Sequence, residues 1–254
     1  MFSGSSVGLA LGVPAASLLG DTLGWRAAFA ALSAASTVVA VLLWRLLPEV
    51  RGAGERPVLR DAARLPGVIR STTAWALFLL GHFVVFAYFA PYLKQLGSGM
   101  TSGLALGVLG FAGVAGVAVT GRVPDRALPR GLLWASALIA SSFAALMVLP
   151  ARSPYLMVIL ALWGASSSGN ILLHQRNVLI VGQKAEAAVA GLSVLVVQAG
   201  IALGAVLGGA TIQLAGISRL PLTGLASVAL SAALVVRRRS KRRCDRPVAA
   251  GTGR

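Results

Sequence analysis

Charged residues are scarce in this sequence: they make up 12% of its 254 residues, and only seven of them are acidic. Soluble domains carry about 25% charged residues, so the deficit excludes an ordinary soluble domain. Hydrophobic residues make up 57% of the chain, and its mean hydropathy is +0.82. This composition favours a protein whose solvent is lipid.

Cysteine and histidine are nearly absent, with one cysteine, Cys244, and two histidines. The chain therefore cannot form an intrachain disulfide, and it shows no metal-ligand spacing. It also has no phosphate-cradling glycine motif and no nucleophile triad. We expect no enzymatic activity, no cofactor and no metal.

Basic residues, by contrast, are plentiful and give a net charge of +16. They gather between and after apolar stretches. This placement favours contact with an anionic lipid leaflet, and we expect no nucleic-acid partner.

Long apolar runs are what the sequence does contain. Each is close to the 20 or so residues that cross a bilayer as a helix, and period-two alternation typical of a barrel is absent. The sequence predicts eight spans, at about 2–20, 27–47, 73–93, 102–120, 131–150, 155–175, 188–214 and 220–236.

The basic residues also predict the orientation of these spans. With the amino terminus in the cytoplasm, all but four of the 23 lysines and arginines fall on the cytoplasmic side, as the positive-inside rule requires. The four exceptions are Arg26, Lys94, Arg152 and Arg219. We therefore expect a multi-pass protein of the cell membrane with both termini cytoplasmic.

One long loop, 48–72, divides two spans from six, and its Pro, Gly and charged residues predict a cytoplasmic linker with a short surface helix at 58–65. The expected domains are two helices in 1–47, the linker 48–72, six helices in 73–236 and a basic cytoplasmic tail in 237–254.

A faint internal repeat has an offset of 192 residues. It aligns Gly8 and Gly12 with Gly200 and Gly204, so the first two spans resemble the last two. If six spans form one half of the protein, the first two are the last third of another half.

The stretch "GLALGVPAASLLGDTLGWRAAF" carries a family resemblance. It resembles the fifth span and the start of the sixth in the major facilitator superfamily, specifically the bacterial drug and sugar efflux antiporters with twelve spans. Gly8, Gly12 and Pro14 match the antiporter motif of that group. The stretch 82–93 resembles its seventh span.

The loop "GRVPDRALPR" is similar to the other signature of the superfamily, of pattern GxxxDRxxxR, through Gly121, Asp125, Arg126 and Arg130. An acid among arginines is not needed for topology. We therefore interpret Asp125 as part of a latch that holds one conformation; the alternative is an ordinary positive-inside loop.

The resemblance implies an all-α polytopic fold of about eight helices: a partial amino-terminal half and a complete carboxy-terminal half, with spans one to four lacking. A mis-called start, a decayed gene and a genuine short form all remain open. The implied function is secondary efflux of a drug, sugar or metabolite by alternating access, driven by proton antiport in the full-length form. The resemblance also implies a location in the inner membrane and a role in drug resistance. The alternative is a truncated, non-transporting protein or a subunit that needs a helix partner or a second copy.

Candidate substrate-binding residues are polar or aromatic side chains within the spans: His82, Tyr88, Asn170 and Gln198. Each has a structural alternative, because a neutral histidine, a tyrosine or an amide also packs between helices. The glycine pairs with a spacing of four, including Gly200 and Gly204, put small residues on one helix face. They indicate close helix packing or a helix at the interface between halves.

Overall fold

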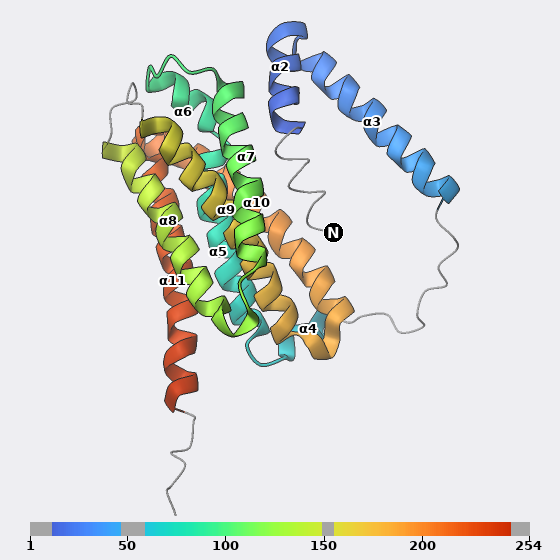
Figure 1. The fold of residues 1–254 in the computed structure, drawn as a ribbon, viewed down its shortest axis with the longest axis vertical. Coiled ribbons are helices and arrows are strands. Elements are labelled where there is room, and N and C mark those ends of the chain that lie inside the picture. The colour runs from blue at the N-terminus through green and yellow to red at the C-terminus, as the bar shows by residue number, and fades with distance from the viewer. Residues whose placement is uncertain (1–11, 47–58, 149–154, 245–254) are drawn as a thin grey trace, which may run out of the picture.

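The computed structural model describes residues 12–46, 59–148 and 155–244, and the regular elements in these ranges are helices (Figure 1). Seven of the described helical segments are long and apolar enough to cross a bilayer. The prediction of an all-α polytopic membrane protein is confirmed. Residues 2–11 of the first predicted span, 2–20, lie outside the described residues, and the rest of the span belongs largely to an 11-residue helix that extends to Leu23.

The helices are α2 (Val13–Leu23), α3 (Trp25–Leu46), α4 (Leu59–Arg64), α5 (Val68–Phe86), α6 (Phe89–Gln95), α7 (Ser102–Gly121), α8 (Leu128–Val148), α9 (Tyr155–Val181), α10 (Glu186–Ala215) and α11 (Leu220–Cys244). Short 3-10 turns precede the last helices: η2 (Asp125–Ala127) before α8, η3 (Gln183–Ala185) before α10 and η4 (Ile217–Arg219) before α11.

The predicted span 73–93 is divided in the structure into α5 and α6. Proline cannot donate a backbone hydrogen bond, and its ring clashes with the carbonyl four residues earlier. Pro91 therefore cannot bond to the carbonyl of Ala87, and the helix breaks at 87–88.

The predicted surface helix at 58–65 is present as α4, whose Ala62 is fully buried. Helix α5 then begins at Val68, within the stretch predicted as a linker. Residues 47–58 of that stretch lie outside the described ranges.

Six long helices form one bundle, with α5 and α9 in contact at its centre. Helix α9 also packs against α7 and α8, whereas α5 packs against α10 and α11, and α8 joins α11. The largest fully buried side chains include Trp75 and Phe78 on α5 and Trp163 on α9. The outer faces stay apolar, as Phe111 and Trp134 illustrate, because lipid and not water surrounds them.

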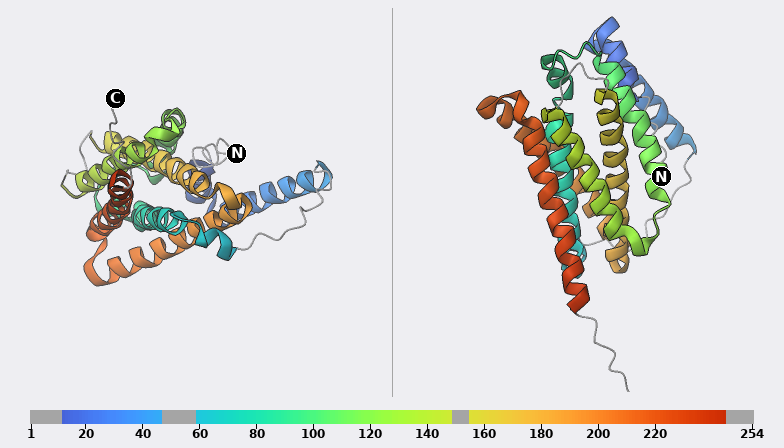
Figure 2. Two further views of the ribbon diagram at one scale, coloured as in Figure 1. Left: turned by 90° about the horizontal axis from the view of Figure 1, so that it is seen from below. Right: turned by 60° about the vertical axis from the view of Figure 1, so that its left-hand side comes forward.

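Helices α2 and α3 stand at one side of this bundle. Helix α2 contacts α7, and α3 extends away from the other helices in the end-on view (Figure 2, left). None of the residues of α3 is buried, although the helix is apolar along its length.

Glycines permit very close contact between α7 and α9. A Cβ atom added to Gly116 would overlap the backbone of Ala165, and one added to Gly164 would overlap the backbone carbonyl of Leu109. Because lipid tails are as apolar as the helices, association depends on such close van der Waals packing. These two glycines let the helix backbones touch.

The predicted glycine stripe on α10 packs against α5 in the same bundle. A Cβ atom at Gly200 would lie 2.6 Å from Cβ of Leu79, and one at Gly204 would lie 2.8 Å from Cβ of Phe83. The stripe is thus in close contact with α5, and its place at an interface between halves stays a prediction. Elsewhere on α5, its Gly81 faces Gly224 of α11, and a Cβ atom added to either glycine would overlap the backbone carbonyl oxygen of the other.

The predicted internal repeat has a counterpart in the backbone. Gly24 ends α2 with φ 84° and ψ 159°, and Gly216, 192 residues later, ends α10 with φ 83° and ψ 157°. Each glycine carbonyl accepts a 3.1 Å hydrogen bond from the residue three positions on. A positive φ favours glycine, so both copies of the turn retain it.

We predict that Gly164→Ala destabilises the bundle by about 1–3 kcal/mol, the usual effect of overpacking a tight contact. The added methyl group meets a backbone carbonyl, which cannot change rotamer. The midpoint of thermal unfolding in detergent measures the effect.

Gly121→Ala is the matched control, because nothing lies within 4 Å of its added Cβ. Its unfolding midpoint should stay equal to that of the wild type or rise. Equal midpoints for both variants would contradict the close α7–α9 contact.

Candidate functional site

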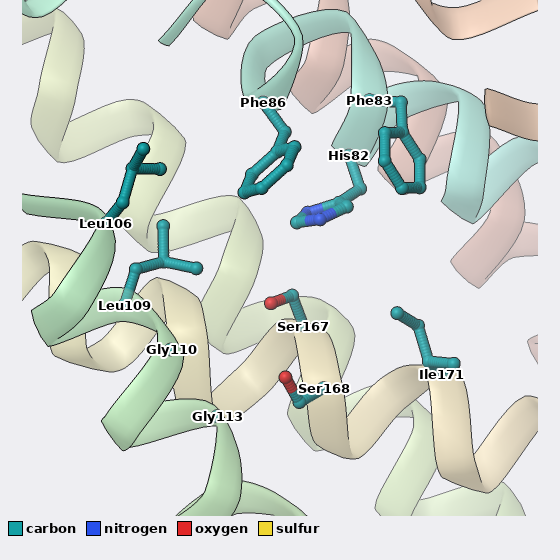
Figure 3. A pocket seen from close by; sticks show the side chains of 10 residues that line it. All are labelled: His82, Phe83, Phe86, Leu106, Leu109, Gly110, Gly113, Ser167, Ser168 and Ile171. Atoms are coloured by element: carbon teal, nitrogen blue, oxygen red, sulfur yellow. The ribbon is translucent and has the colours of Figure 1, made fainter. Parts of the chain in front are cut away.

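A cavity of about 80 Å³ lies between α5, α7 and α9. The side chains around it converge from these three helices (Figure 3). Its lining residues are His82, Phe83, Phe86, Leu106, Leu109, Gly110, Gly113, Ser167, Ser168 and Ile171. The cavity is thus apolar for the most part, with one imidazole and two hydroxyl groups.

His82 gives the cavity its main polar edge. Nε1 of Trp163, on α9, donates a 3.1 Å hydrogen bond to Nδ1 of His82. Because Nδ1 accepts, the neutral imidazole must carry its proton on Nε2. The ring points into the cavity in Figure 3. Its second nitrogen, Nε2, is therefore the atom of His82 that can donate a hydrogen bond to a ligand.

Aromatic rings hold this imidazole on several sides. Phe86 stacks on it with ring centroids 5.4 Å apart, and Phe83 meets it edge to face at 5.0 Å. Trp163 is itself fixed by Phe89 and Phe143, at 5.2 and 5.4 Å. The donor to His82 therefore has a defined position.

The α7 and α9 sides of the cavity are built from small residues. Gly110 and Gly113 of α7 have no side chains to fill it. Ser167 donates its hydroxyl hydrogen to the carbonyl of Gly164 at 3.1 Å, which leaves its oxygen as an acceptor. Ser168 completes the polar lining.

The other predicted binding residues lie away from this cavity. Tyr88 donates to the carbonyl of Ala205 at 3.0 Å and packs between α5 and α10. Asn170 is fully buried between α9 and α8, where its amide donates to Ser136 at 3.0 Å. Gln198 is exposed on α10. Of the four candidates, only His82 lines the cavity, and the binding roles of the others stay predictions.

His174 and Trp163 are notable residues that the sequence analysis did not select. His174 is fully buried, and its ring stacks on that of Phe78 with centroids 5.5 Å apart. Neither ring nitrogen has a hydrogen-bond partner among the described residues. A tryptophan in an apolar span gives no signal of its own, and only the structure pairs Trp163 with His82.

The loop after α7 is held to α9 by an ion pair. Arg176 donates to Asp125 at 2.5 Å and to the carbonyl of Thr120 at 3.4 Å. The side chains of Arg176 and Asp125 are 25% and 66% exposed. The predicted pairing of Asp125 with an arginine is thus present, and its partner comes from α9, whereas Arg126 and Arg130 are exposed.

The predicted antiporter motif is only partly described. Gly8 lies outside the described residues, and Pro14 stands in the first turn of α2. No atom lies within 4 Å of a Cβ added at Gly12. Farther along α2, Leu18 forms a shallow groove with α7 residues that include Leu104 and Gly107.

Within the described ranges, no group of three or more histidine, cysteine or acidic side chains could hold a metal ion. No charged side chain lines the cavity. The described part of the chain therefore offers an apolar site in the bundle and an ion pair at the end of α7, but no metal centre.

Residues 1–180, well over half of the chain, match the sequence profile of the Major Facilitator Superfamily. The chain belongs to the major facilitator superfamily. The resemblance predicted from its glycine motifs and its loop is confirmed. Membership agrees with the multi-pass, all-helical architecture of the described residues.

Three curated proteins are similar to this chain over most of its length. The chain is 30% identical over 250 residues to the inner membrane transport protein YdhP of Escherichia coli O157:H7, covering 92% of this chain and 62% of the relative. It is 27% identical to a probable sugar efflux transporter of Helicobacter pylori strain G27, over 87% of this chain and 58% of the relative.

The transcription regulatory protein OpdE of Pseudomonas aeruginosa is 30% identical over 214 residues, or 81% of this chain and 53% of the relative. The chain thus spans between about half and three fifths of the length of these curated relatives.

We predict that nitrogen NMR of isotope-labelled histidine, with the protein in lipid nanodiscs, finds His82 in the Nε2–H tautomer. Trp163→Phe keeps an aromatic ring but removes the donor, so the His82 signal should become a mixture of tautomers. The chain has two histidines, and the signal of His174 serves as an internal reference. An unchanged His82 signal in the variant would exclude the hydrogen bond.

A second prediction concerns the ion pair. Asp125→Asn and Arg176→Gln should couple by about 0.2–1 kcal/mol in a double-mutant cycle of unfolding free energies, since both side chains are partly exposed. High salt should reduce this coupling. Arg130→Gln, combined with Asp125→Asn, is the control and should show none. A salt-independent coupling, or an equal one for Arg130, would refute the pairing.

Proposed function

We propose that this chain serves the secondary export of a small molecule by alternating access, with the cavity at His82 as part of its substrate site. Two of the relatives are described as transport proteins. In transporter folds built from repeats, substrates bind near the bilayer midplane.

The observation that carries this proposal is the depth of the cavity. Ser168 is the central residue of α9, and Gly110 and Gly113 lie on either side of the centre of α7. His82 lies near the middle of the segment formed by α5 and α6. All three helices thus contribute their central residues to one space, as a site at the midplane requires.

The proposal also includes the coupling of export to proton movement. An ionisable residue within a span is a functional candidate by default, and His82 is the titratable residue that lines the cavity. Of the acids in the described ranges, Asp125 and Glu186 begin helical segments, Asp21 lies in the last turn of α2 and Asp61 lies in the short helix α4. We propose antiport against protons in the assembled transporter, with His82 as the group in the substrate path that can bind a proton.

The ion pair of Asp125 with Arg176 is proposed as a latch for one conformation. It joins the loop after α7 to α9, and these two helices form one side of the cavity. A movement of α8 with its preceding turn relative to α9 would break the pair.

A second candidate function is a subunit that needs further helices, and the exposure of α3 favours it. By the 192-residue offset, α3 corresponds to α11, whose Ser231 and Val235 are buried against the bundle. Their counterparts Val39 and Leu43 are exposed. We propose that further transmembrane helices, from a longer chain, a partner or a second copy, cover this face.

Efflux measurements test the site. His82→Leu and Gln198→Leu would be introduced into the gene in its native host, and efflux of labelled sugars and aromatic compounds measured in inverted membrane vesicles. We expect His82→Leu to slow efflux by about tenfold, the effect of losing one substrate hydrogen bond, and Gln198→Leu to leave it unchanged. If Gln198→Leu slowed efflux and His82→Leu did not, the substrate site would have to lie at α10 instead.

Proteoliposomes that contain only the purified chain separate the two candidate functions. We expect no counterflow from the 254-residue chain alone, because α3 lacks the packing that its counterpart has. Counterflow at the rate of the native vesicles would eliminate the subunit alternative. Immunoblots and unfolding midpoints verify that all variants are inserted and folded.

A further inference from the structure

We propose that the cavity takes an uncharged, flat aromatic molecule that presents a hydrogen-bond acceptor to Nε2 of His82. This inference rests on the proposed function, since it treats the cavity as the substrate site. It narrows the substrate from any small molecule to one chemical class.

The first step concerns the direction of the hydrogen bond. Trp163 occupies Nδ1 of His82, so the edge that faces the cavity donates. The matching ligand group is an acceptor such as a carbonyl, nitro, ether or ring-nitrogen group. A ligand with only donors could pair with the oxygen of Ser167 but would leave Nε2–H of His82 unpaired, which is costly in an apolar site.

The second step concerns charge. No charged side chain lines the cavity. An ion moved from water into apolar surroundings without a counter-charge is strongly disfavoured. The cavity therefore selects against lipophilic cations and against carboxylate or phosphate compounds.

The third step concerns shape and polarity. Phe83 and Phe86 present aromatic rings, and Leu106, Leu109 and Ile171 add aliphatic surface. Such a lining favours a flat ring that stacks or packs edge to face. The cavity volume, about 80 Å³, is about half that of an engineered 150 Å³ cavity known to accept benzene. It thus holds at most one small ring, which can be the end of a larger molecule that extends out of the cavity.

The fourth step separates this class from sugars. A sugar carries a hydroxyl group on most of its carbon atoms, and each needs a partner when buried. The polar lining consists of one imidazole edge and two serines, and Ser167 has already donated its hydrogen to Gly164. Most hydroxyl groups of a sugar would stay unpaired here.

Binding to the whole chain in lipid nanodiscs tests the inference, with equilibrium dialysis against empty nanodiscs to subtract partition into lipid. The probes are 4-nitroanisole as a neutral aromatic acceptor, methyl β-glucoside as a sugar and tetraphenylphosphonium as a cation. We expect only 4-nitroanisole to bind above the lipid background. His82→Leu should weaken its binding by about tenfold, whereas His82→Gln, which keeps an N–H donor, should restore most of it.

Ser141→Ala on α8 is the matched control, because it also removes a polar group from a span but lies outside the cavity, and its binding of 4-nitroanisole should equal that of the wild type. Unfolding midpoints confirm that the variants fold. A measurement on the wild type does not depend on them: 4-nitroanisole should shift the His82 Nε2 signal in nitrogen NMR and leave the His174 signal in place.

Two results would overturn the inference, and they differ in what they leave standing. If the glucoside or the cation binds with the same dependence on His82 and 4-nitroanisole does not, the ligand class is wrong but the site stands. If no probe depends on His82 and its NMR signal never moves, both the ligand class and the proposed site fail.

Discussion

Contact between helix backbones is the constraint on which this structure depends. In lipid, apolar side chains gain little by leaving their surroundings, so helices associate through close packing and hydrogen bonds. Gly116 and Gly164 bring α7 and α9 together, and the stripe on α10 does the same for α10 and α5. The opposed pair of Gly81 and Gly224 joins α5 to α11. At Gly116 and Gly164 the nearest atoms belong to the facing backbone, so no side chain there could adjust to a larger residue.

These contacts divide the bundle into two groups. One group is α7 with α9, and the other is α5 with α10 and α11, while α8 packs against both α9 and α11. Between the groups, at the centre of the bundle, the contact is made by aromatic side chains: Phe78 stacks on His174, and His82 meets Trp163. Side chains can change rotamer where touching backbones cannot. The cavity lies along this boundary, where movement of one group against the other would change its shape.

The sequence predicted the fold well because apolar run lengths and basic flanks depend on the bilayer and not on tertiary detail. It predicted the site less well. Helices α9 and α10 are apolar on every side, so periodicity does not show which face is inward. Residue type alone therefore could not show that Asn170 lies against α8 or that Gln198 is exposed, and the binding roles of both stay predictions. His82 was identified because an ionisable residue within a span is informative wherever it points.

The same imidazole connects the packing of the bundle to its candidate chemistry. Trp163 precedes Gly164, the glycine at which α9 touches the backbone of α7. The α7–α9 contact therefore sets the position of the indole N–H group, and that group in turn determines which edge of His82 faces the cavity. A hydrogen bond that crosses the boundary between the two helix groups also fixes the donor that a ligand would meet. A relative movement of the two helix groups and the binding of a ligand in the cavity would then both act on His82. An alternating-access site needs such a physical link between movement and binding.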